Sequence, residues 1–196
     1  MTLLVAYARE RLTPGRLLPA VLLVVVAVTA GGGWSGSSAV ATDALLALAL
    51  VVAFRIADDL VDRDRDRLKH PDRVVVRAPS TAPLRLAGWI LAFGATVALD
   101  RTHSHGSAVL LWVYSAVLGV SYARRSSPAV ASATAGVAAD RILLLKYGVF
   151  TLALIGLPAA LTARGLLSAA GAFLAACVYE WWHDAESPVF SFGGLR

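Results

Sequence analysis

The chain has 196 residues, of which 58% are hydrophobic and 16% charged, and its mean hydropathy is +0.68. Charged residues make up about a quarter of an ordinary soluble domain, so this composition argues against that class. A net charge of +5 is also found in nucleic-acid-binding proteins, but in a membrane protein a basic excess belongs to cytoplasmic loops. We therefore expect residues 1–196 to form a single integral membrane domain that binds no nucleic acid.

Six apolar segments follow one another along the chain, each near the roughly 20 residues that a helix needs to cross a bilayer. Helices are favoured over strands because the segments show no alternation, and because backbone groups in lipid must be hydrogen-bonded within the segment. The expected fold is therefore all-α, a polytopic membrane bundle of about six transmembrane helices. The segments are Leu17–Gly33, Ala39–Ala57, Leu84–Leu99, Ser107–Tyr122, Ile142–Leu161 and Leu166–Trp182.

Basic residues are distributed unevenly between the two sides of such a bundle. If the N-terminus is cytoplasmic and the six segments alternate in direction, all but two of the 18 Lys and Arg residues face the cytoplasm, the exceptions being Arg101 and Arg164. Positively charged loops stay in the cytoplasm, so we expect both termini there, in a multi-pass protein of a bacterial-type plasma membrane. No small-residue cleavage site follows the first segment, which we expect to be retained.

The stretch RIADDLVDRDRDRLKHPDR, residues 55–73, follows the second apolar segment and mixes aspartates with arginines. As a continuation of the second helix, it would align several of its charges on one narrow face. Stacked carboxylates repel one another unless a cation lies between them, and Mg²⁺ prefers carboxylate and phosphate oxygens. The residues on that face are Arg55, Asp59, Asp62 and Asp66, with Asp58 at its edge.

The neighbouring arginines could bind a phosphate or diphosphate as bidentate donors. The alternative interpretation of the stretch is a solvated segment whose charges pair locally, for example Asp64 with Arg67.

Lys146 lies inside the fifth apolar segment. An ionisable residue at such a position indicates a functional site, unless its long stem reaches the membrane interface instead.

Four short motifs resemble those of the UbiA-type intramembrane prenyltransferases. The pattern DD-x-x-D-x-x-x-D at residues 58–66 is similar to the first aspartate motif of that family, at the cytoplasmic end of its second helix. HPDR at residues 70–73 resembles the Asn-Pro-x-Arg stretch that follows, and SYARR at residues 121–125 resembles the Tyr-Ser…Lys-Arg element. E-x-x-x-D at residues 180–184 has the spacing of the second motif, D-x-x-x-D. Its two acidic residues, Glu180 and Asp184, would lie on the same face of a helix.

The resemblance implies a helical bundle around a lipid-open cavity. It implies magnesium-dependent ionisation of a prenyl diphosphate and transfer of the prenyl group to a small-molecule or lipid acceptor. The catalytic residues would be Asp59, Asp62, Asp66, Glu180 and Asp184, and these together with Asp58 would hold the magnesium. The diphosphate would contact Arg73, Tyr122, Arg124, Arg125 and Lys146. Two alternatives stay open, a terpene cyclase of the same type and a non-catalytic membrane protein that binds metal or a lipid diphosphate.

The sequence departs from the family pattern at three places. Asp58 stands where the family has asparagine, and the stretch after Arg73 differs from the usual Arg-Pro-Leu-x-x-Gly. The sequence ends shortly after the second acidic motif, so we expect it to match the front two-thirds of that architecture. Four possibilities then remain open: a cavity that is open on one side, a homodimer, a complex with a partner subunit, and a truncated product with no activity.

Overall fold

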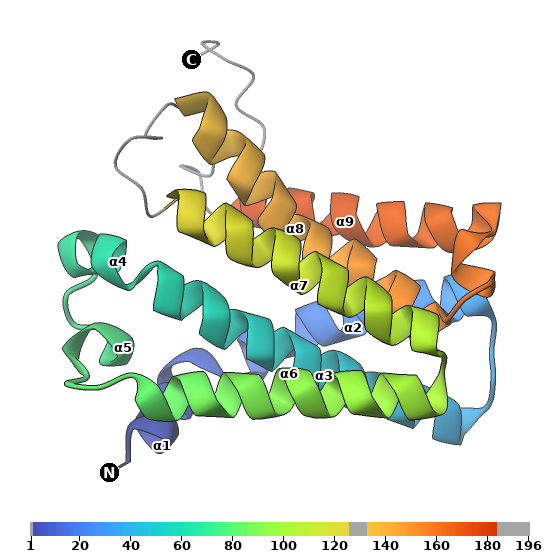
Figure 1. The fold of residues 1–196 in the computed structure, drawn as a ribbon, viewed down its shortest axis with the longest axis horizontal. Helices are drawn as coiled ribbons and strands as arrows, with labels where there is room; N and C mark the ends of the chain where they lie inside the picture. Colours follow the sequence, from blue (N-terminus) through green and yellow to red (C-terminus); the bar gives the residue numbers. More distant parts are fainter. Residues whose placement is uncertain (1, 126–132, 184–196) are drawn as a thin grey trace.

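The computed structural model describes residues 2–125 and 133–183, and the secondary-structure elements within these ranges are helices. Six long helices run roughly along the longest axis of the molecule (Figure 1). They are α2 (Pro14–Gly32), α3 (Ser37–Val61), α6 (Ala82–Thr102), α7 (His105–Arg125), α8 (Ala133–Ile155) and α9 (Ala163–His183). The short elements are α1 (Leu3–Arg11), α4 (Arg63–Lys69), α5 (Val74–Arg77) and the 3₁₀ turn η2 (Ala159–Leu161).

Five helices are long and apolar enough to cross a membrane, which confirms the prediction of a multi-pass helical bundle. The spans are Pro14–Gly32, Ser37–Val61, Ala82–Thr102, His105–Ala123 and Ala163–Trp182. In α8 the apolar part is shorter, Ile142–Ile155. The predicted boundary of this fifth segment at Leu161 is wrong. The helix ends at Ile155 because Gly156 has φ +77°, a left-handed conformation that glycine adopts without a steric penalty.

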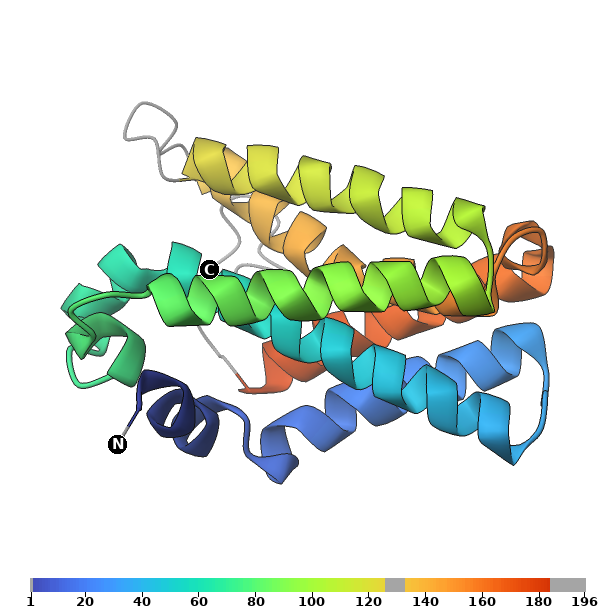
Figure 2. The same cartoon turned by 60° about the horizontal axis from the view of Figure 1, so that its bottom comes forward.

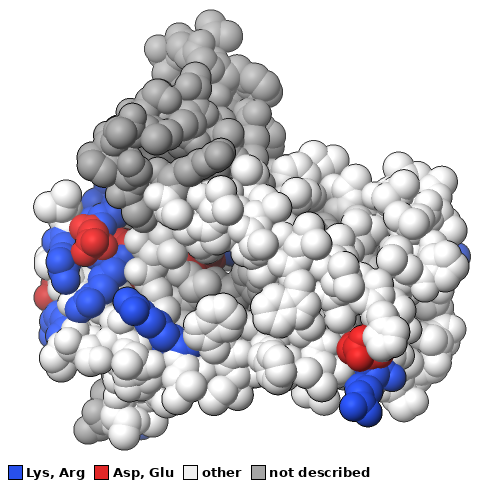
Figure 3. Space-filling model, in the orientation of Figure 1, with Lys and Arg blue, Asp and Glu red and all other residues white. Residues whose placement is uncertain are grey.

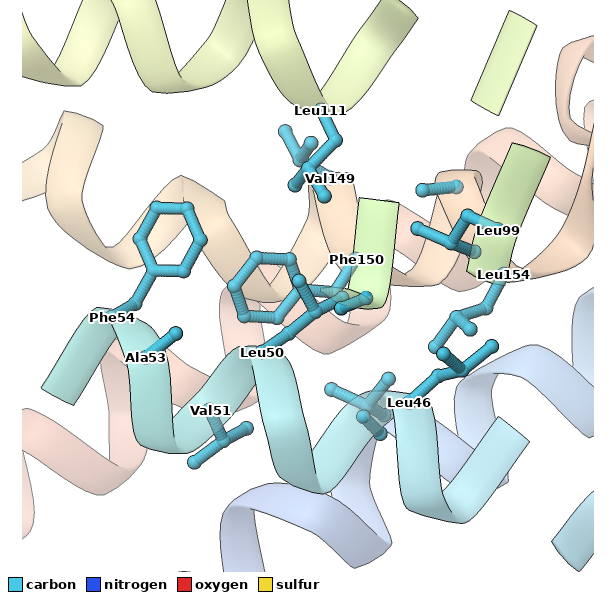
Figure 4. Close-up of a cluster of buried hydrophobic side chains, with 14 of the residues drawn as sticks. Leu46, Leu50, Val51, Ala53, Phe54, Leu99, Leu111, Val149, Phe150 and Leu154 are labelled. Atoms are coloured by element: carbon cyan, nitrogen blue, oxygen red, sulfur yellow. The ribbon is translucent and has the colours of Figure 1, made fainter. Parts of the chain in front are cut away.

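The six long helices pack side by side in a closed order, α3–α6–α7–α8–α9–α2, in which α2 contacts α3 again. The centre is filled by apolar side chains of α2, α3, α6, α7 and α8 (Figure 4). Phe54 and Phe150 meet there edge to face, with their ring centroids 5.1 Å apart. The resemblance implied a cavity inside the bundle. In this structure apolar side chains fill the centre, and a hollow lies at the side of the bundle, between α6 and α7.

Most of the charged side chains visible in Figure 3 gather at the end of the bundle where α1, α4 and α5 lie (Figures 1 and 2). A small apolar cluster joins these short elements to the long helices, with Tyr7 from α1, Ile56 from α3, Val75 from α5 and Leu84 from α6. Tyr7 is 1% exposed and Leu84 is fully buried. The N-terminal helix therefore packs against the end of α3 that carries the aspartates.

Candidate functional site

Two adjacent aspartates at the end of α3 bind different partners. Asp58 accepts hydrogen bonds from the Tyr122 phenol of α7 and from the Lys146 ammonium of α8. Lys146 is only 9% exposed, so this ion pair is largely shielded from water. The structure thus brings together three residues predicted for the site, from three different helices.

Asp59 is held by α1, which the sequence did not predict as part of the site. Arg11 donates to both carboxylate oxygens of Asp59, from Nε at 2.9 Å and from Nη2 at 2.5 Å, and the Tyr7 phenol donates to it at 2.8 Å. Arg55 lies further away, with Nε 3.7 Å from Oδ2. Arg11 and Tyr7 lie about fifty residues before Asp59, so no local pattern could have identified them.

The two α1 residues have shifted pKa values. Burial raises the pKa of Tyr7 above its ordinary range, and the neighbouring Asp59 carboxylate adds to this shift. Burial alone would lower the pKa of Arg11. The hydrogen bonds to Asp59 and its negative charge outweigh this effect of burial, so the pKa of Arg11 is raised overall. Arg11 is therefore a permanent cation beside Asp59, and Tyr7 a permanent neutral donor.

The predicted continuation of the second helix through Asp66 is wrong in one respect, because the helix is interrupted at Asp62. α3 ends at Val61 and α4 begins at Arg63, although the amide of Asp62 still donates to the carbonyl of Asp58 at 2.9 Å. Asp62 is half-buried at this junction. The aspartates on the two sides of it consequently belong to separate helices.

Asp66 in α4 is buried and forms an ion pair with the half-buried Arg73, so two further predicted site residues are in contact. This pair links α4 to the turn before α5. Arg63 strengthens the link because its Nη2 donates to the Ala78 carbonyl at 2.6 Å. The pairing of Asp66 with Arg73 accounts for both charges without a ligand.

The second acidic motif is described only in part. Glu180 is half-buried near the end of α9, a helix whose main packing partners are α8 and α2. Asp184 lies outside the described residues. Arg124 and Arg125 are the last two residues of α7, and their side chains also lie outside the described part. A meeting of the two acidic motifs therefore stays a prediction.

The described carboxylates do not fit a magnesium site in this arrangement. Within residues 2–125 and 133–183, no three His, Cys, Asp or Glu side chains are placed to hold a metal ion. Asp58, Asp59 and Asp66 each face a different lysine or arginine. Magnesium needs carboxylate oxygens that are not already neutralised, so these ion pairs would have to open. The magnesium requirement stays a prediction.

A hollow of about 320 Å³ lies between α6 and α7, with α3 as its floor, and we call it the α6–α7 groove. Its walls are mainly apolar, and it ends in polar groups at Arg85 and Tyr122. A second hollow of about 220 Å³ shares Phe54, Trp89, Ala92 and Ser115 with it and extends it toward the far end of the bundle. Figure 3 shows a depression on this side of the molecule, with charged atoms visible at its bottom.

The groove exists because the facing positions carry small side chains, including Ala57, Gly88, Ala92, Ser115 and Gly119. Apolar cavities with a few polar groups at one end are typical binding sites for small molecules. The arrangement suits an amphiphile with a long apolar tail and an anionic head. Comparison of the chain with models of known protein families, with curated proteins and with solved structures gives no match.

Proposed function

We propose that this protein transfers the prenyl group of an allylic isoprenoid diphosphate to an acceptor within the membrane. The observation that carries the proposal is the α6–α7 groove, an apolar channel along the side of the bundle that ends at Arg85 and at Tyr122. Tyr122 is in turn hydrogen-bonded to Asp58, which holds Lys146. The motif resemblance supports the same function, because Asp58 and Tyr122 both belong to those motifs.

In the proposed reaction, the groove shields the prenyl tail from water, and the chain supplies the charge that the leaving group needs. The allylic C–O bond breaks and its electron pair leaves with the diphosphate. Arg85, at the end of the groove, stabilises the negative charge that develops, and Lys146 neutralises the Asp58 carboxylate behind Tyr122. Phe54 and Trp89 line the groove, and their aromatic rings can stabilise the allylic cation. The acceptor nucleophile then bonds to the cationic carbon and loses a proton to the surroundings.

The direct test is incubation of the full chain in lipid nanodiscs with short-chain and long-chain allylic diphosphates and a mixture of phenolic and lipid acceptors. Released diphosphate and prenylated products are measured, with magnesium present or removed by a chelator. Diphosphate release together with an acceptor adduct supports the proposal. No release from any of the allylic diphosphates would contradict it.

A groove-filling variant tests where the tail lies. Ala92 lines both hollows, so Ala92→Phe would block the passage between them. We expect turnover of the long-chain diphosphate to fall by about tenfold or more, with turnover of the shortest one retained, because the added phenyl ring would fill the space that the longer tail needs. The matched control is Ile90→Phe, an exposed position of the same helix outside both hollows. An equal loss of long-chain turnover in both variants would refute the proposal that the prenyl tail lies in the groove.

A second candidate function is binding without chemistry. It is favoured by the ion pairs of Asp58, Asp59 and Asp66, which leave these carboxylates engaged with the cations of the chain itself. Saturable binding of a prenyl diphosphate without any product would support this candidate. A product formed with no acceptor present would instead indicate a cyclase.

A further inference from the structure

A second, polar cavity lies on the face of α3 opposite to the α6–α7 groove. Its volume is about 50 Å³, and we call it the basic cavity. Val51 and Arg55 of α3 line it, whereas Ala53 and Ala57 of the same helix line the groove. Its lining residues are Arg11, Arg16, Leu17, Ala20, Val51, Arg55, Lys146, Tyr147 and Phe150.

The basic cavity has more positive than negative charge around it. Four cationic side chains line it, and two of them, Arg11 and Lys146, are each 9% exposed. The carboxylates in direct contact with these cations are Asp59, which holds Arg11, and Asp58, which holds Lys146. Glu10 adjoins Arg11 in the sequence, but its Oε2 accepts a hydrogen bond from the backbone amide of Val74.

The two remaining cations are the most available for a ligand. Arg16 donates from Nη1 to the backbone carbonyl of Glu10 at 2.9 Å, and within the described residues it contacts no carboxylate. Arg55 reaches Asp59 only at 3.7 Å. Like charges gathered in a partly dehydrated space repel one another, so an anion among them relieves this repulsion.

We infer that the basic cavity binds a compact phosphate anion, either free inorganic phosphate or the phosphate head group of a membrane lipid. A space of about 50 Å³ exceeds the roughly 10–15 Å³ that a cavity needs to hold one water molecule, and it is too small for a bulky organic ligand. Arginine side chains match the tetrahedral oxygens of a phosphate as bidentate donors. The site is separate from the proposed prenyl-transfer site, because Lys146 lines the basic cavity and is linked to the groove only through Asp58 and Tyr122.

The inference is tested on the full chain in nanodiscs of zwitterionic lipid. Binding of radiolabelled inorganic phosphate is measured by equilibrium dialysis, with Arg16→Gln and Arg55→Gln as cavity variants. We expect each to weaken the binding about tenfold or more, because each removes a charge-assisted hydrogen bond. Both positions are at least partly exposed, so the variants should fold. Arg77→Gln, at an exposed site in α5 outside the cavity, is the control for loss of one positive charge.

A second arm distinguishes the two sources of phosphate. The nanodiscs are prepared with phosphatidic acid, and the lipid that remains bound after delipidation is quantified by mass spectrometry for the same variants. Retention of phosphatidic acid by the wild type and the Arg77→Gln variant, but not by the cavity variants, identifies the lipid head group. Saturable uptake of free phosphate with the same pattern identifies the free anion. If neither ligand binds, or if Arg77→Gln weakens binding as much as the cavity variants do, the inference is overturned.

Discussion

At the scale of single residues, a specific lysine or arginine neutralises each of the aspartates Asp58, Asp59 and Asp66. Asp59 is 4% exposed and receives three hydrogen bonds, two from Arg11 and one from Tyr7. By contrast, the pair of Asp64 and Arg67, 3.1 Å apart, is exposed. Removing one partner of a buried ion pair leaves an uncompensated charge, whereas an exposed pair contributes little to stability.

This contrast yields a prediction for stability. Asp59→Asn should lower the free energy of unfolding in detergent by about 3–5 kcal/mol, because Arg11 then remains buried without a counter-charge. Asp64→Asn should change the free energy of unfolding by about 1 kcal/mol at most. Reversible unfolding monitored by circular dichroism measures both values. The double variant Arg11→Met with Asp59→Leu should recover most of the loss, since neither charge remains. Equal stability of the two single variants would show that the Asp59 pair is not structural.

The sequence predicted some residues of the candidate site at the end of α3 and missed others, and the difference has a physical reason. Asp58, Tyr122 and Lys146 could be named because motif spacing and an ionisable residue in an apolar segment are local signals. Arg11 could not be named, since its partner Asp59 is 48 residues away and a long-range ion pair leaves no periodic pattern. The choice of partner for each aspartate depends on how the helices pack.

At the scale of secondary-structure elements, the short helices α1, α4 and α5 are held in place by contacts outside themselves. α5 consists of VVVR, and a run of β-branched residues does not favour a helix on its own. Its first amide, on Val74, donates to Oε2 of Glu10 in α1 at 2.9 Å, and Val75 packs in the same apolar cluster as Tyr7. This dependence on tertiary contacts explains why the sequence predicted neither α1 nor α5 as a helix, and predicted the first part of α4 only as a continuation of the second helix.

Hydrogen exchange can test the link between α1 and α5. Glu10→Ala removes the acceptor for the Val74 amide, so peptides covering residues 74–78 should exchange about tenfold faster or more, because an unpaired amide loses its protection. Glu10→Gln keeps an acceptor oxygen and should preserve slow exchange. Peptides from the middle of α6 should be unaffected in both variants. Unchanged exchange of residues 74–78 in Glu10→Ala would mean that α5 is held by other contacts.

At the scale of the whole molecule, the helical segments could be predicted and their packing order could not. Apolar length indicates a span because lipid requires internally satisfied backbone groups. The closed order of helices depends instead on close approaches such as Gly148, where an added Cβ would lie 3.0 Å from the Ala169 carbonyl oxygen. Small residues permit such contacts between membrane helices, but the sequence does not show which helix is the partner.

The orientation in the membrane remains a prediction, and labelling of introduced cysteines can test it. The natural Cys177 is buried and would be changed to alanine in the background chain. Ser80→Cys lies at the charged end of the bundle and Ser35→Cys lies between α2 and α3, and both positions are exposed. In intact cells, a membrane-impermeant maleimide should label the Ser35→Cys variant alone, because basic loops stay in the cytoplasm. Labelling of Ser80→Cys alone would reverse the assigned orientation.

The sideways position of the α6–α7 groove determines how an occupant would reach it. α6 and α7 diverge toward the charged end in both ribbon views, and the hollow lies on the flank of the bundle (Figures 1 to 3). A molecule that partitions into the bilayer would arrive by lateral diffusion among the acyl chains. Its effective concentration would then be its mole fraction in the lipid. Dilution of the vesicles in buffer should leave occupancy unchanged, whereas dilution of the ligand with extra lipid should lower it.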